Sequence, residues 1–465
     1  MQRDLHPTRR SFLKQLGAAG LGAWTLSLVK PESAFGAAAN NKLNLALLGC
    51  GGRMRQLLPS ILDPGENVVA LCEVNFSRLA QLKREAAKHG AAGAALDQAR
   101  VYEDYRKLLA EEKSVDAVVI AAGQRWHVPM SKAALQAGKH VFCEKPLAHS
   151  VVEAREIREI ARASKLATQV GTQGGSTATF RRSMEVIQAG VLGQVREAHC
   201  WINRSFPPSA PVAMKPDPIP EGLNWDFWCG PSPLLPFKRY YLGGCLAWGR
   251  WLAFGDGHLA DMGAHAINLP WRALKLGAAQ RASVRIPEPL QDSYPSATDF
   301  RWDFAPRGQL APVTVWWHDG VKAGPPEELG RELVSTLDKV PTNGVLFAGE
   351  AGLLYSDAWG VGGMVKLKGE SEGRRVFEHP QCRTVPVTLP RAPQNHMQEW
   401  LDACKGGPQT FQGFVSSADI AEVAMVGMVA LRLGKPVEWD SQNLKANGEP
   451  GADRFIHLAP RTQWL

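Results

Sequence analysis

The feature that most constrains this chain is a strand, a glycine turn and a helix, in that order, near residue 50. Residues 43–48 are a short apolar run that ends at Gly-Cys-Gly-Gly-Arg-Met, residues 49–54, and a helical apolar pattern follows through Ile61. Gly49 permits a tight turn, Gly51 lets the backbone approach a phosphate, and the helix N-terminus offers free N–H groups to its charge. This order predicts a dinucleotide site.

The turn departs from the usual Gly-x-Gly-x-x-Gly pattern at its last glycine. Met54 stands there, while Gly52 adds a glycine directly after Gly51. We expect Gly52, Arg53 and Met54, at the start of the helix, to contact the cofactor together with the first two glycines.

A second apolar run, residues 68–72, ends at Glu73. A carboxylate at this place accepts hydrogen bonds from the adenosine ribose hydroxyls and repels a 2′-phosphate. The cofactor is therefore predicted to be NAD. NADP stays open as an alternative because Arg78 lies close in sequence.

The alternation continues through residue 143. Apolar runs at 116–122 and 140–143 are separated by helical patterns such as 76–88 and 128–137. Alternating short strands and helices predict an α/β fold with a doubly wound parallel sheet, a Rossmann domain over residues 40–170.

Polar residues follow the last two of these runs, where ligands bind such sheets. They are Gln124-Arg125-Trp126-His127 and Glu144-Lys145-Pro146. A Rossmann domain with Glu-Lys-Pro at this place resembles the Gfo/Idh/MocA oxidoreductases. The family's Thr-Pro-Asp/Asn-x-x-His is replaced by residues 122–127, which keep only the histidine. The resemblance implies cofactor contacts from Ala122, Gln124, His127, Glu144 and Lys145.

The resemblance extends into residues 171–465, expected to form a substrate and oligomerisation domain. Residues 168–173 resemble the strand that opens the family's second domain, and 224–231 resemble a branch of predicted secreted members. Short β-rich runs predict an α+β domain with a large, mostly antiparallel open sheet and helices on one face. These runs are 195–201, 313–318 and 345–347. The proline-rich stretch 206–241 is interpreted as a lid or a subunit arm.

The resemblance assigns catalysis to Lys145, Asp261 and His265. Asp261 and His265 are four residues apart, which places both on one face of a helix. A neutral His265 could take the substrate proton while Lys145 stabilises the alkoxide, but the sequence leaves open which of the two is the base. Further substrate contacts are expected from Trp126, His127, Arg250 and His258.

Two other residue sets near Asp261 have alternative interpretations. Asp256, His258, Asp261 and His265 carry donors that Zn or Mn could use, but the resembled family works without a metal, so none is predicted. Six tryptophans between Trp201 and Trp271 either stack on sugar faces or pack in a core.

The N-terminus reads as an export signal. Arg9-Arg10-Ser11-Phe12-Leu13-Lys14 precedes an uncharged stretch and then small residues at 34–39, which resembles a twin-arginine signal over residues 1–39. We expect periplasmic or otherwise exported protein, carried by the twin-arginine machinery. No later segment is judged apolar and long enough for a permanent membrane anchor.

Part of the net charge of +8 comes from the N-terminus, where Arg3, Arg9, Arg10 and Lys14 cluster. No basic run elsewhere alternates with aromatics, so nucleic acid is not expected as a partner. The predicted partner is a small sugar or polyol, bound by a homodimer or homotetramer.

Free NAD is not regenerated outside the cytoplasm, so the cofactor is expected to stay bound. The intact Glu-Lys-Pro favours an oxidoreductase that oxidises a secondary hydroxyl of a sugar, glycoside or polyol. One alternative is a redox-neutral glycosidase similar to the NAD-dependent α-N-acetylgalactosaminidases. A second alternative is a non-catalytic protein that binds NAD or a sugar.

Overall fold

The structure is a computed structural model that describes residues 42–464 except 338 and 393–394. The expected signal, residues 1–39, lies outside the described residues.

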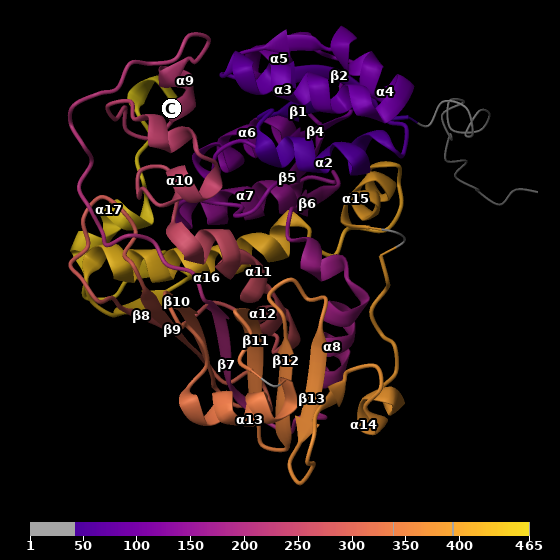
Figure 1. The fold of residues 1–465 in the computed structure, drawn as a ribbon, viewed down its shortest axis with the longest axis vertical. Helices are drawn as coiled ribbons and strands as arrows, with labels where there is room; N and C mark the ends of the chain where they lie inside the picture. The colour runs from indigo at the N-terminus through magenta and orange to yellow at the C-terminus, as the bar shows by residue number, and fades with distance from the viewer. Residues whose placement is uncertain (1–41, 338, 393–394, 465) are drawn as a thin grey trace, which may run out of the picture. The chain divides into compact units, whose positions relative to one another are not determined.

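The first sheet has six parallel strands in the order β3-β2-β1-β4-β5-β6, with helices on both faces (Figure 1). Its strands are β1 (Asn44–Leu48), β2 (Asn67–Cys72), β3 (Arg100–Tyr102), β4 (Ala117–Ile120), β5 (His140–Cys143) and β6 (Thr168–Val170). Its helices are α2 (Gly52–Leu62), α3 (Phe76–Ala86), α4 (Gly90–Ala95), α5 (Tyr105–Glu111), α6 (His127–Gln136) and α7 (Val151–Ala163). The doubly wound sheet confirms the predicted fold class.

Two strands of this sheet differ from the expectation. β3 has only three residues, too few to give an apolar run. β6 was expected to open the second domain, but it pairs in parallel with β5 and completes the first sheet. The chain therefore leaves the first domain after Val170 and not before Thr168.

The second sheet has ten strands in the order β14-β13-β12-β11-β7-β10-β9-β8-β15-β16. Every neighbouring pair is antiparallel except β7 with β10, which confirms the mostly antiparallel open sheet. The strands are β7 (Val195–Ile202), β8 (Arg281–Arg285), β9 (Thr298–Phe304), β10 (Val313–Asp319), β11 (Asn343–Gly349), β12 (Gly352–Ser356), β13 (Gly363–Leu367), β14 (Arg374–Arg375), β15 (Val437–Asp440) and β16 (Lys445–Ala446).

Helices cover one face of this sheet and part of the other. The main core joins the sheet to α8 (Ala178–Gln188), α12 (Asn268–Ala273) and α16 (Phe414–Leu433). On the opposite face, Leu333 of α13 (Glu327–Leu337) packs against Trp201 and Leu346. The remaining helices are α9 (Trp225–Cys229), α10 (Cys245–Gly249), α11 (Ala264–Ala266), α14 (Pro380–Thr384), α15 (His396–Cys404) and α17 (Asp453–Ile456).

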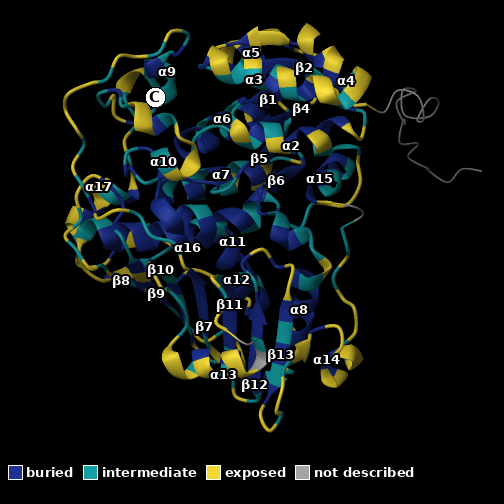
Figure 2. Ribbon diagram, in the orientation of Figure 1, coloured by how far each residue is buried: buried dark blue, intermediate teal, exposed yellow. Residues whose placement is uncertain are grey.

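Helix α16 corrects the expectation that no later segment is long and apolar enough to cross a membrane. It has 20 residues and a mean hydropathy of 1.7 in its most apolar window, but 83% of that window is buried inside the protein. Figure 2 shows it dark blue along its length. Its apolar character is that of a core helix.

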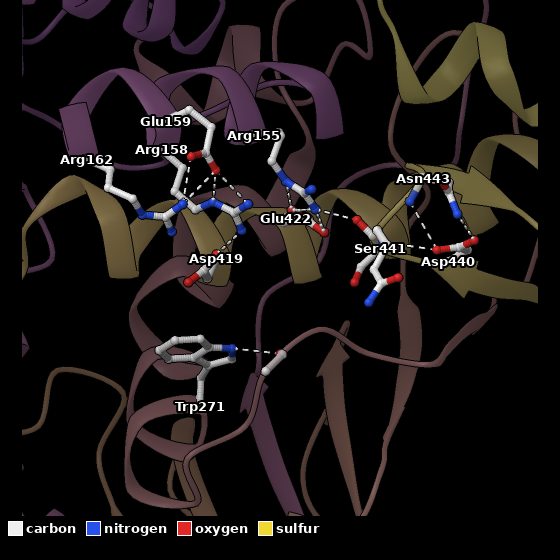
Figure 3. A network of polar contacts seen from close by, with 12 residues as sticks. Arg155, Arg158, Glu159, Arg162, Trp271, Asp419, Glu422, Asp440, Ser441 and Asn443 are labelled. Atoms are coloured by element: carbon white, nitrogen blue, oxygen red, sulfur yellow. Dashed lines mark hydrogen bonds and ion pairs between the residues drawn. The ribbon is translucent and has the colours of Figure 1, made fainter.

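Two arginines of α7 fix the first domain to α16 (Figure 3). Arg155 donates to both carboxylate oxygens of Glu422, with Nη2–O distances of 2.9 Å, and Arg158 donates to Asp419 at 2.7 Å. Helix α15 also packs on the first domain, where Met397 and Trp400 join its core. The two domains are therefore joined by ion pairs and by apolar packing.

Candidate functional site

A cleft of about 530 Å³ lies at the carboxyl ends of β1, β2, β4 and β5. Its other wall comes from residues 227–249 and from the π-helical turn Leu259–Gly263. We call residues 222–254 the arm. Most of the predicted cofactor residues line this cleft, which places them where the sheet topology predicted.

The glycine turn at the start of α2 is shaped to receive a phosphate. Gly49 has φ +83°, and a Cβ there would lie 2.6 Å from the Ala122 nitrogen, so only glycine fits. A Cβ at Gly51 would meet nothing within 4 Å, so the backbone faces open space. Helix α2 has no side-chain cap and no acid in its first turn. Its free N–H groups suit a pyrophosphate.

Two residues of the turn contribute differently from the expectation. The side chain of Met54 is fully buried in the core, so only its backbone faces the cofactor side. Arg53 donates to Glu144 at 2.8 Å, which turns it toward the glutamate after β5.

Glu73 holds the glycine turn in place. Its carboxylate accepts backbone N–H groups from Cys50 at 2.7 Å and from Val74 and Asn75 at 2.9 Å. Burial raises the pKa of Glu73, and these hydrogen bonds oppose that rise. The residue also lines the cleft.

The side chain of Glu144 pairs with Arg53 and not with the neighbouring Lys145. A Cβ at Gly171 would lie 2.6 Å from this carboxylate, so glycine leaves room for it. Burial raises the pKa of Glu144, against the lowering effect of Arg53. The pairing leaves Lys145 free to face the second domain.

Lys145 and Asp261 come from different domains and form the centre of the site. Lys145 Nζ donates to Asp261 Oδ1 at 2.6 Å and to the Asp261 carbonyl oxygen at 2.9 Å. Arg204 donates to the other carboxylate oxygen at 3.0 Å. Burial raises the pKa of Asp261, but Lys145 and then Arg204 lower it further, so the pKa lies below its ordinary value. Arg204 was missed because it follows β7 with no motif around it.

His265 is buried near this pair, with its ring 4.5 Å from that of Trp359 and tilted by 51° to it. Asp261 lies in the π-helical turn and lines the cleft, whereas His265, in α11 after the turn, does not. Burial and then Lys145 lower the pKa of His265 well below its ordinary value. Neither ring nitrogen has a partner among the described residues. The ring is neutral and able to accept a proton.

The loop 122–127 lines the cleft, and its side chains also make contacts that fix its position. His127 bonds the carbonyl oxygens of Pro146 and Ala122, and burial lowers its pKa to about 4. Gln124 donates to Asp256 at 2.7 Å. Trp126 packs edge-on against Tyr105 and Trp464. These contacts fix the loops after β4 and β5 relative to each other.

Two predicted substrate contacts do not reach the cleft. His258 is completely buried and stacks on Phe206 at 3.8 Å. Arg250 donates to the carbonyl oxygen of Pro208 at 2.9 Å. Asp256 bonds His149 rather than its sequence neighbours, and no three His, Cys, Asp or Glu side chains in the described part of the chain are placed to hold a metal.

The arm covers the cleft and is anchored at both ends of it. At the β2 end, Phe76 N–H donates to Gly222 O at 3.0 Å and Arg78 donates to Leu242 O at 2.8 Å. At the β4 end, Arg125 donates to the carbonyl oxygens of Trp228 and Cys229 at 3.0 and 3.1 Å. A ligand in the cleft is therefore held under the arm.

The tryptophans divide between the two interpretations. Trp225 packs at 4.7 Å on Trp228 and lies in an aromatic core with Tyr241 and Phe254. Trp228 and Trp248 line the cleft. A larger cavity of about 1270 Å³ lies beyond Arg125 and Trp126, but it is lined neither by the glycine turn nor by Lys145.

Known proteins share these features. A family model described as "Oxidoreductase family, NAD-binding Rossmann fold" matches residues 43–172, and one for its C-terminal alpha/beta domain matches 181–302. A glycosyl hydrolase family 109 protein of Parabacteroides distasonis is 27% identical over 210 residues, 42% of this chain and 44% of that protein. An inositol 2-dehydrogenase of Salmonella paratyphi B is 31% identical over 140 residues, 29% of this chain and 38% of that protein.

These matches span less than half the length of either curated relative. The fold of an aldose–aldose oxidoreductase from Caulobacter crescentus is similar over 85% of this chain and 99% of that one, with a TM-score of 0.57 and 16% identity. With the two family models matching in succession and both sheets present, the chain belongs to the Gfo/Idh/MocA oxidoreductase family.

Proposed function

We propose that this protein uses a tightly bound nicotinamide dinucleotide, NAD rather than NADP, to oxidise a secondary hydroxyl of a sugar or polyol. The observation that carries the proposal is the Lys145–Asp261 ion pair, which lies in the same cleft as the glycine turn. A bound nicotinamide would supply the hydride acceptor. The glycine turn and the free N–H groups of α2 would hold its pyrophosphate, and Glu73 its adenosine ribose.

The chain's own residues would control the substrate oxygen and its proton. Lys145 donates two hydrogen bonds to Asp261, so its third N–H is free for the substrate hydroxyl. As an ammonium, it stabilises the negative charge that develops on that oxygen. We assign the proton to His265, because its ring is neutral and both nitrogens lack a partner in the described chain. Since His265 does not line the cleft, the proton would reach it through a bridging group such as a water molecule.

The arm supports a cofactor that stays with the protein. Its anchors at Phe76, Arg78 and Arg125 must open before a dinucleotide can leave. We propose that the cofactor is loaded before the folded protein is exported through the twin-arginine signal. Replacing Arg9 and Arg10 by lysine should leave the cofactor-loaded precursor in the cytoplasm. A variant that is exported normally would contradict this route.

Mixing the purified protein with a panel of sugars and polyols tests the activity. We expect a substrate to reduce the bound nicotinamide and a second carbonyl compound to oxidise it again. If no member of the panel changes the nicotinamide absorbance, the proposed oxidation is wrong.

Redox-neutral glycoside cleavage is a second candidate, favoured by the similarity to the family 109 glycosyl hydrolase. Aryl glycosides distinguish the two activities. A glycosidase releases the aglycone without a net change in nicotinamide, whereas the oxidoreductase proposed here leaves the glycosidic bond intact.

A further inference from the structure

We propose that the substrate is a sugar acid, whose carboxylate binds Arg204 beside Lys145. The inference rests on the proposed function and names the substrate class for the same site. It starts from an imbalance of charge around Asp261.

Asp261 is one carboxylate shared by two cations. Lys145 binds Oδ1, and Arg204 binds Oδ2 from the other side. The side chains of Lys145 and Asp261 are 16% and 15% exposed, and that of Arg204 is 39% exposed, so the cluster has a net charge of +1 and its surplus cation is open to a ligand. Where the cluster is partly withdrawn from water, an anionic ligand that neutralises this charge is favoured.

Neighbouring groups do not remove this charge. Glu144 is already paired with Arg53, and burial keeps the imidazoles of His258 and His265 neutral. Arg125 adds a further cation to the same cleft. It is 3% exposed, no carboxylate contacts it among the described residues, and its Nη1 has no hydrogen-bond partner.

An oxidised nicotinamide ring would add one more positive charge at this end of the cleft. A ligand with a single negative charge is therefore favoured over a neutral one. Arg204 is suited to supply the contact, because only one of its donors is committed to Asp261 and its side chain is 39% exposed. A planar guanidinium binds a carboxylate through two parallel hydrogen bonds.

The test compares matched neutral and acidic sugars with the holoprotein: glucose, glucuronate, gluconate and glucose 6-phosphate. Reduction of the bound nicotinamide gives kcat/KM for each. We expect kcat/KM for a sugar with a carboxylate to exceed that for its neutral counterpart by about 100-fold. A higher salt concentration should reduce this ratio. Neutral glucose reacting as fast as the acids would overturn the inference, and so would a preference for the phosphate ester.

Variants of Arg204 test whether this residue binds the substrate carboxylate. Arg204→Gln should lower kcat/KM for the acid by about 10- to 100-fold more than it lowers kcat/KM for the neutral sugar, because both substrates lose the contact to Asp261 but only the acid loses its charge partner. Arg204→Lys should recover part of the loss, because the charge returns without the planar donor pair. The matched control is Arg196→Gln, at the other end of β7, where the side chain is 61% exposed and pairs with Glu350. Equal losses for both sugars in Arg204→Gln would reject the assignment.

The outcomes separate this inference from the proposed function. If neutral sugars reduce the cofactor as well as acids do, the oxidoreductase proposal stands and only the sugar acid is rejected. If no sugar reduces it, although nicotinamide is bound, the oxidoreductase proposal fails and the inference fails with it.

Discussion

The two walls of the cleft are held by different kinds of interaction. On the sheet side, short turns after parallel strands are fixed by backbone contacts, such as the close packing of Gly49 on Ala122 and the bonds from Glu73 to three N–H groups. On the arm side, a long irregular segment is held by Arg78 and Arg125 donating to its carbonyl oxygens and by its own aromatic core. The first wall is suited to fixing reacting groups, and the second to retaining a ligand.

This difference predicts that changes on the sheet side alter chemistry or cofactor binding outright. Changes on the arm side should alter how long the ligand stays. Lys145 gives the largest expected effect, because it follows β5 on the sheet side of the cleft and donates to Asp261 from there.

Lys145→Met should lower kcat by about 10³-fold, since it removes the charge that stabilises the developing alkoxide. Steady-state kinetics with the best sugar measures the loss, and the nucleotide content should stay near that of the parent protein. Lys88→Met removes an exposed lysine paired with Glu85 and should change neither quantity. Full turnover in Lys145→Met would remove the residue from the mechanism.

Gly49→Ala should prevent cofactor binding and lower stability by about 2 kcal/mol or more, because its Cβ would collide with the backbone at Ala122. Gly65 is a close control, since it also has φ +83° but its nearest neighbour would be Lys42 at 3.9 Å. Gly65→Ala should cost only about 1 kcal/mol. Urea unfolding midpoints measure the difference. Equal shifts in the two variants would mean that the close approach at Gly49 is unimportant.

Arg125→Gln should speed loss of the bound dinucleotide by about tenfold, because it removes the charged donor to Trp228 and Cys229. Dilution into a nucleotide-degrading enzyme gives the release rate. Arg461→Gln loosens the arm from outside the cleft, at Gly230 and Asp226, and should have a smaller effect. Unchanged release in both variants would show that the arm does not retain the ligand.

The last effect is a dependence of protein stability on pH. Burial raises the pKa of Asp319 to about 7, although Thr298, Trp317 and Tyr294 donate to it. The folded state then holds a proton that the unfolded chain has lost, so stability falls as pH rises from about 4 to 7. Asp319→Asn should remove this slope. Its free energy of unfolding, relative to that of the parent protein, should therefore rise by about 1 kcal/mol per pH unit over that range. An equal difference in unfolding free energy between Asp319→Asn and the parent protein at pH 5 and at pH 7 would contradict the raised pKa of Asp319.

The sequence predicted the sheet-side wall well because local rules fix it. Apolar runs, a glycine turn and polar residues at strand ends have short-range patterns, and they placed Gly49, Glu73 and Lys145 at one edge of the sheet. β3 was missed, and β6 was assigned to the second domain, because a three-residue strand has no periodicity to detect.

The arm-side wall could not be predicted in the same way, since long-range contacts determine it. Arg204 meets Asp261 across 57 residues, and Arg125 meets Trp228 across 103. His258 and Arg250 were expected at the substrate because of their neighbours in sequence. Instead, His258 stacks on Phe206 and Arg250 donates to the carbonyl oxygen of Pro208, so neither lines the cleft. The i, i+4 argument for Asp261 and His265 assumed a regular helix, whereas Asp261 lies in a π-helical turn and only Asp261 lines the cleft.

The most direct test of the central claim is the nucleotide content of the native protein. The protein is purified in its folded form, denatured, and the supernatant assayed for NAD and NADP. The account predicts nearly one equivalent of NAD, in oxidised and reduced forms together, with little NADP because Glu73 lines the adenosine end of the cleft. Protein that releases no nucleotide and does not bind added NAD would contradict it.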